Sequence, residues 1–137
     1  MKDPPFIDIL ITMTTAAIIS IIIFSLLSVF QLLLIVGAPL GHFAWGGQHK
    51  TLPRKLRVGS AVSILIYAAF IVCILSKAAI WPILPEGTFL DVSLWIMTAY
   101  LTLGILLNAI SRSRPERYTM TPVVFVLTIC LFIIASS

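Results

Sequence analysis

The chain has 137 residues, of which 60% are hydrophobic and only 10% are charged. An average soluble domain is about 45–50% apolar and about 25% charged, so this sequence lacks the polar residues that would cover a core in water. The formal net charge of +4 comes from basic residues that lie beside apolar segments. That arrangement favours a lipid bilayer with anionic headgroups as the partner and argues against nucleic acid. The length allows one domain.

Four apolar segments follow one another along the chain. A membrane span takes about 20 helical residues, and the sequence predicts spans over 7–36, 58–79, 90–110 and 118–135. The first is long enough to cross with tilt or to extend past the interface, and it exceeds the roughly 7–15 apolar residues of a signal peptide. Backbone groups in hydrocarbon must be satisfied locally, and no segment alternates as a barrel strand would. We therefore expect an all-α membrane protein, a bundle of four transmembrane helices in one domain over 1–137.

Proline and glycine mark the ends of these helices. Gly37 and Pro39 follow the first span, because glycine loosens the backbone and proline cannot donate a hydrogen bond. Thr51 and Pro53 predict a cap and the first turn of the second helix. The basic loops are then expected over 37–57 and 111–117.

The charges of the loops predict the orientation of the chain. With four spans, the two basic loops share one side and carry seven of the nine basic residues; the other side carries Lys2 and Lys77. Lysine and arginine concentrate in short cytoplasmic loops. We therefore expect the basic loops in the cytoplasm and both termini outside an inner or plasma membrane.

Six of the seven basic residues form two clusters at the membrane boundary. Such clusters act as orientation signals, and they can also bind anionic lipid headgroups. The candidates are Arg54, Lys55, Arg57, Arg112, Arg114 and Arg117.

The least ordinary motif is the sequence G-A-P-L-G-H-F-A-W-G-G over residues 37–47. Its four glycines permit close backbone approach and unusual dihedral angles. Non-helical backbone near membrane depth is tolerated only where protein or a water-filled cavity covers it. One interpretation is a re-entrant or interfacial loop that presents His42, with Trp45, to a ligand, a proton or a metal. The other is a tight connection in which His42 donates to a carbonyl.

This motif, followed by L-P-x-x-L-R, resembles a pattern found in small uncharacterised bacterial four-span integral membrane proteins. The segment from Asn108 to Pro122, N-A-I-S-R-S-R-P-E-R-x-x-x-x-P, is similar to the junction between their third and fourth spans. The resemblance rests on these two loop motifs. It implies a bacterial inner-membrane protein and brings no substrate or catalytic residue.

Metal and catalytic sites find little support in the sequence. His42 and His49 are the only histidines, and no neighbouring cysteine or carboxylate completes a ligand set, so no metal site is expected. Haem with His42 as axial ligand is the one cofactor left open. Glu116 is the only carboxylate on the basic side, and we expect it to pair with the neighbouring arginines.

Polar residues inside the spans are candidates for a binding site. Gln31 and Asn108 fall toward the basic side, and Tyr67 and Tyr100 lie about 15 Å deep at a rise of 1.5 Å per residue. They either line a site together with His42 and Trp45 or hold helices together by hydrogen bonds. No charged residue lies in mid-membrane, which argues against proton-coupled transport.

Three functions fit these features. The chain is a binding or transport module for a small molecule or lipid, an accessory or immunity-type interaction protein, or a membrane enzyme that uses His42 as acid or base. A homodimer or a larger membrane complex is compatible with each of them.

Overall fold

The computed structural model describes residues 4–137, and this part of the chain contains four α-helices. They are α1 (Pro4–Ile35), α2 (Arg54–Lys77), α3 (Thr88–Ala109) and α4 (Arg114–Ala135), with two single 3-10 turns, η1 (Gly41–Phe43) and η2 (Trp45–Gly47), between α1 and α2. Each α-helix is long and apolar enough to cross a membrane. The predicted all-α bundle of four candidate spans is confirmed.

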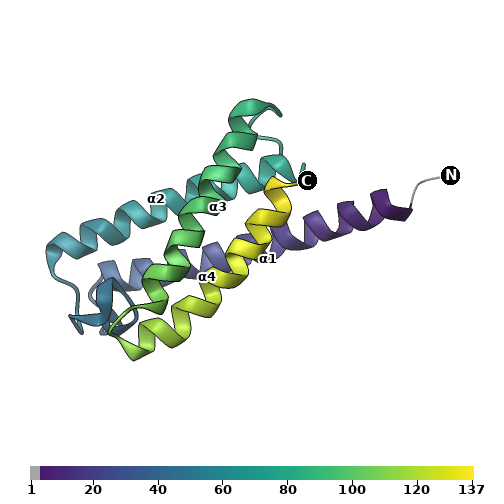
Figure 1. Cartoon of the computed structure of the whole chain (residues 1–137). Coiled ribbons are helices and arrows are strands. Elements are labelled where there is room, and N and C mark those ends of the chain that lie inside the picture. Colours follow the sequence, from purple (N-terminus) through teal and green to yellow (C-terminus); the bar gives the residue numbers. More distant parts are fainter. Residues whose placement is uncertain (1–3) are drawn as a thin grey trace.

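The helices pack as two close pairs joined through α1 and α4. The most extensive contacts are those of α3 with α4 and of α1 with α2, α1 also packs against α4, and α2 and α3 touch each other little. Figure 1 shows α2 and α3 running at a large angle to each other. We call the end with loops 36–53 and 110–113 the basic end, and the end with loop 78–87 and the C-terminus the opposite end.

The outer surface of the bundle is apolar. Leu26, Leu65 and Phe89 are 65%, 71% and 74% exposed, and similar side chains cover the outward faces of all four helices. A contiguous apolar surface of this kind requires an apolar surrounding. The four helices therefore contact a lipid bilayer, and the chain is a multispan membrane protein.

The interior combines large apolar side chains with small residues. Ala16, Ala17 and Ser20 of α1 are buried in the region where Cys130 and Leu131 of α4 are also buried. Small residues let helix backbones approach closely, which is how helices associate in lipid without a hydrophobic driving force. The contact of α1 with α4 thus rests on these small side chains.

Helix α1 is longer than the bundle that it joins. Its 32 residues extend about 48 Å at 1.5 Å per residue, whereas α2, α3 and α4 have 22 to 24 residues. Residues 5–12 are exposed, and Figure 1 shows this part of α1 projecting past the other helices. Helix α1 thus extends beyond the bundle, and both predicted alternatives for the first span stay predictions.

Two helices begin four residues earlier than the apolar pattern predicts. Helix α2 starts at Arg54, after Pro53 at the cap position, and α4 starts at Arg114, after Ser113, whose hydroxyl accepts from Glu116 N–H. The prediction placed both boundaries where the charges end. A helix can continue past the hydrocarbon, however, because charged side chains at its end reach the interface. Both basic clusters therefore lie largely on helical turns.

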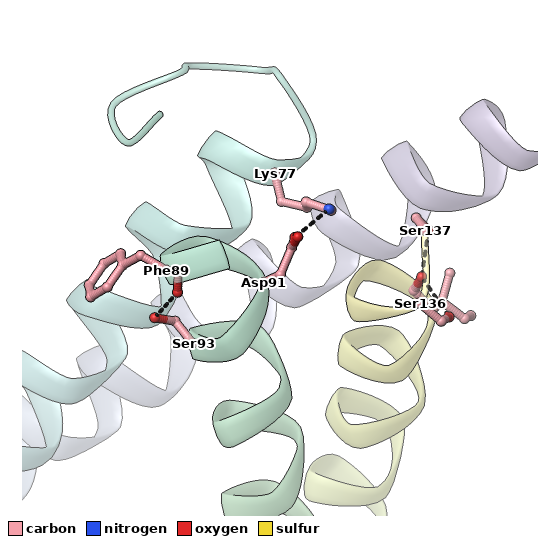
Figure 2. Close-up of polar contacts among 7 residues, drawn as sticks. Lys77, Phe89, Asp91, Ser93, Ser136 and Ser137 are labelled. Atoms are coloured by element: carbon pink, nitrogen blue, oxygen red, sulfur yellow. Dashed lines mark hydrogen bonds and ion pairs between the residues drawn. The ribbon is translucent and has the colours of Figure 1, made fainter. Parts of the chain in front are cut away.

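An ion pair joins α2 to α3 at the opposite end. Lys77 Nζ lies 2.7 Å from Asp91 Oδ1, across loop 78–87 (Figure 2). Lys77 is in the last turn of α2 and Asp91 in the first turn of α3, so each charge is also favourable to its helix dipole. Leu84 N–H donates to Ser76 Oγ at 2.9 Å and anchors the loop. Of the residues on this side named in the orientation argument, Lys2 and Asp3 lie outside the described part.

Arg57 holds the basic end together. Its Nε donates to the carbonyl of Leu52 at 2.8 Å, and its Nη1 donates to the carbonyl of Ile35, in the last turn of α1, at 3.4 Å. A cation at a helix C-terminus satisfies free carbonyls and interacts favourably with the dipole. Arg57 thus connects the start of α2, the loop before it and the end of α1.

We predict that Arg57→Ala lowers the free energy of unfolding by about 2 kcal/mol, because two charge-assisted hydrogen bonds to backbone carbonyls are lost. The measurement is unfolding in detergent, followed by helical circular dichroism. Arg54→Ala is the matched control: Arg54 is exposed on the same turn, so its loss should cost less than about 0.5 kcal/mol. Equal effects of the two substitutions would contradict this role of Arg57.

Candidate functional site

A cavity of about 420 Å³ lies in the half of the bundle next to the basic end. Side chains from all four helices line it, and the segment Phe43–Gly46 closes it toward loop 36–53. A volume of this order is within the usual range of small-molecule sites, about 300–1,000 Å³. The lining residues of α1 and α3 and most of those of α4 lie in the helix halves that face the basic end, and α2 contributes Tyr67 from near its middle.

Five of the six residues predicted to bind a ligand line the cavity: Gln31, Trp45, Tyr67, Tyr100 and Asn108. The sixth, His42, does not line it. Four of them come from the first three predicted spans, and Trp45 comes from the glycine-rich loop. Their convergence on one space is a tertiary feature; their binding role stays a prediction.

Gln31 supplies the most unusual group in the wall. Its side chain is only 8% exposed and lies within hydrogen-bonding reach of Tyr67. Its Oε1 has no hydrogen-bond partner among the described residues. Leaving a buried acceptor without a partner costs about 1–3 kcal/mol. The cavity wall therefore contains a buried acceptor that receives no hydrogen bond from the described residues.

Aromatic rings form the wall above Gln31. Phe24 lies 5.5 Å from Tyr67 and 5.5 Å from Phe70, and Phe70 lies 5.7 Å from Tyr100, measured between ring centroids. Tilted and edge-to-face contacts of this kind are favourable. The two predicted tyrosines are therefore linked through a continuous aromatic cluster that joins α1, α2 and α3.

Trp45 closes the cavity at the basic end in a strained backbone conformation. Its φ is 53°, and Gly46 and Gly47 follow with φ of 75° and 70°; a bulky residue rarely adopts positive φ. The indole Nε1 donates to Ser60 Oγ at 3.3 Å, and a Cβ on Gly59 would lie 2.7 Å from the ring. Contacts with α2 thus hold Trp45 in place, and they require glycine at position 59.

Asn108 and Glu116 bring further acceptors to the cavity. Asn108 Nδ2 donates to the carbonyl of Gly104 at 2.8 Å, so the side-chain oxygen is the group left for a ligand. Glu116 is only 9% exposed, and its carboxylate accepts from the Ser111 hydroxyl. Ser111 Oγ in turn accepts from Ser113 N–H at 3.2 Å. Glu116 thereby belongs both to the cap of α4 and to the cavity wall.

The expected pairing of Glu116 with neighbouring arginines is wrong. Among residues 4–137 the ion pair is Lys77–Asp91, and Arg117 donates instead to the carbonyl of Ser111 at 3.2 Å. Glu116 lies in the first turn of α4 and faces inward, which the linear spacing of charges does not reveal. The signal that could have singled it out is its position as the one acidic residue at the basic end.

His42 lies outside the cavity, on the exposed surface of the loop. Its Nδ1 is 3.3 Å from the carbonyl oxygen of Gly47, and its own carbonyl accepts from the Ser113 hydroxyl. This is the geometry of the tight connection, the second of the two interpretations of the loop. In the described part of the chain, no group of three or more His, Cys, Asp or Glu is placed to hold a metal ion.

The six predicted headgroup residues divide into two kinds. Arg57 and Arg117 donate to backbone carbonyls, so their cationic groups are engaged within the protein. The other four are exposed at the basic end and are free of such contacts within residues 4–137: Arg54, Lys55, Arg112 and Arg114. Headgroup binding stays a prediction for these four.

The cavity opens sideways. Tyr100, Leu103 and Leu107 on its α3 wall are 50%, 55% and 57% exposed, whereas α2 contributes Tyr67 alone to the lining. These side chains connect the cavity wall with the apolar outer surface of α3.

Comparison with protein-family models, curated proteins and solved structures found no match. The resemblance of the loop motifs to small bacterial four-span proteins accordingly stays a prediction. The site has to be interpreted from its own geometry.

We predict that Gly59→Ala displaces the Trp45 ring, because an added methyl group would lie within van der Waals distance of it, and overpacking costs about 1–3 kcal/mol. The measurement is the fluorescence emission of Trp45 in a Trp81→Phe/Trp95→Phe background, in which it is the sole tryptophan. Val62→Ala, on the exposed face of α2, is the control. Identical emission spectra of the Gly59→Ala and control proteins would show that the contact is absent.

Proposed function

We propose that this integral membrane protein binds a small amphipathic molecule, which it takes from the bilayer into the cavity near the basic end. The observation that carries the proposal is the unpartnered Oε1 of Gln31, buried in a space lined largely by aromatic and aliphatic side chains. A few polar groups within an apolar pocket are typical of ligand sites. Packing between helices accounts for the contact of Gln31 with Tyr67 on α2 and leaves the Oε1 atom without a partner.

The lateral opening supports an amphipathic ligand. The apolar part of such a molecule would lie against the exposed α3 rim formed by Tyr100, Leu103 and Leu107, and its polar part would reach Gln31 and Asn108. Trp45 closes the site toward the loop. Binding from the bilayer is the first step of transport as well, so this proposal covers a binding and a transport module alike.

One observation favours the interaction protein as a second candidate. The first turns of α1 expose Phe6, Ile9 and Ile11, although Phe6 and Ile9 also line a hollow with Leu90 and Ser137. An apolar helix that extends past its own bundle offers a surface to another membrane protein. The enzyme hypothesis gains no such support, because the His42 ring lies against the carbonyl of Gly47.

The binding proposal predicts that the protein purified in mild detergent retains a small molecule that Gln31→Leu loses. Leucine keeps most of the side-chain volume and removes the acceptor, so retention should fall about tenfold if one buried hydrogen bond is lost. Mass spectrometry of the extracted molecules measures this. Ser25→Ala, which removes an exposed hydroxyl on the same helix, is the control. Equal extracts from all three proteins would contradict the proposal.

We also propose that the basic end faces the cytoplasm, and that the membrane is a bacterial inner membrane, as the loop motifs imply. The support for the orientation is the excess of lysine and arginine in the loops and first helical turns at this end. Alkaline phosphatase fused after Ser137 should then be active, and the same enzyme inserted after Gln48 should be inactive. The reverse pattern would overturn the orientation and leave the cavity unaffected.

A further inference from the structure

We propose that the polar group of the ligand is a protonated amine and that Glu116 is its counter-ion. This inference rests on the proposed binding function and adds the chemical class of the ligand. Glu116 lines the same cavity as Gln31 and Asn108, and its carboxylate is nine-tenths buried. The observations that carry the inference are the kind of hydrogen-bonding groups, the sign of the charge and the aromatic lining.

The polar groups of the wall include three acceptors. Gln31 offers an Oε1 without a partner among the described residues. Asn108 donates from its Nδ2 to the carbonyl of Gly104, and its side-chain oxygen is a second acceptor on a residue that lines the cavity. The Glu116 carboxylate receives the Ser111 hydroxyl and has further lone pairs for a donor. A ligand that complements three acceptors is rich in N–H groups, as an ammonium group is.

The charge of the lining is negative. Although the basic end of the molecule carries seven cations, none of them is among the residues that line the cavity. Arg117, the next residue after Glu116, donates to the carbonyl of Ser111 and lies 4.9 Å from the centroid of the Tyr118 ring. An anionic headgroup inside the cavity would meet a carboxylate and no cation. Anionic lipids are therefore expected at the outer arginines and not in this cavity.

The aromatic lining is suited to a cation. Trp45, Tyr67 and Tyr100 line the space, and the faces of such rings attract ammonium groups, most strongly where water is excluded. A carboxylate in the same low-dielectric space adds a charge-assisted hydrogen bond. Together these groups would bind a hydrophobic amine, with its apolar part in the lateral opening and its ammonium group at Glu116.

The structural role of Glu116 can be separated from its proposed role as the counter-ion of the ligand. Its contact with Ser111 belongs to the cap of α4, and glutamine serves at this third helical position as well as glutamate does. Glu116→Gln therefore keeps an acceptor for Ser111 and removes the charge alone. Glu86→Gln removes an exposed carboxylate at the opposite end, so the two proteins have equal net charge and differ in where the charge is lost.

The test uses three ligands with one fluorophore and different charges. They are dansylcadaverine, which is cationic, its neutral N-acetyl derivative, and the anionic dansyl derivative of aminohexanoic acid. The full chain with Trp81→Phe and Trp95→Phe is placed in nanodiscs of a neutral lipid, so that energy transfer from Trp45 reports binding in the cavity. Protein-free nanodiscs correct for partition into the lipid.

We expect the cationic ligand to bind about tenfold more tightly than the neutral and anionic ones, the effect of one charge-assisted contact with aromatic support. Glu116→Gln should abolish this preference, whereas Glu86→Gln should preserve it. Binding of all three ligands with equal affinity, or a preference that survives Glu116→Gln, would overturn the amine assignment and leave the binding function standing. Absence of saturable transfer from Trp45 to any of the three would overturn both.

Discussion

The segment between α1 and α2 has to satisfy its backbone polar groups at the boundary of the bilayer, where water is scarce and no regular helix does it locally. The structure meets this requirement with contacts from three directions. Gly41 N–H donates to the carbonyl of Lys50 at 2.8 Å, Arg57 donates to carbonyls on both sides of the segment, and the Ser113 hydroxyl donates to the carbonyl of His42. The last contact ties the segment to the start of α4.

This folded segment forms one wall of the cavity. Trp45 packs on Gly59 and donates to Ser60. At the opposite end, the Lys77–Asp91 ion pair keeps α2 and α3 together. Away from this ion pair, α2 and α3 touch each other little. The loop between α1 and α2 and the helices therefore define the cavity together.

The cations of the basic end and the carboxylate of the cavity occupy different places, which the net charge does not reveal. Cations gather on the surface of the basic end, where they meet solvent and headgroups or bond backbone carbonyls, while the cavity a few residues away holds one carboxylate and two amide oxygens. The low dielectric of the interior strengthens every electrostatic interaction, so this small group of atoms is the basis of the proposed preference for a cation.

The sequence by itself determined the number of spans, their approximate extent and the depth of Gln31, Tyr67, Tyr100 and Asn108, because a helix in lipid satisfies its backbone locally and depth follows from its constant rise. It also indicated Trp45 as a candidate binding residue. It could not determine which way each side chain faces or which loop groups meet. The helix starts had local signals, Pro53 before α2 and the Ser113 cap of α4. The exclusion of His42 from the cavity, the inward position of Glu116 and the bond from Arg57 to the end of α1 were decided by tertiary structure. Each depends on packing between segments far apart in the chain, and no local pattern records them.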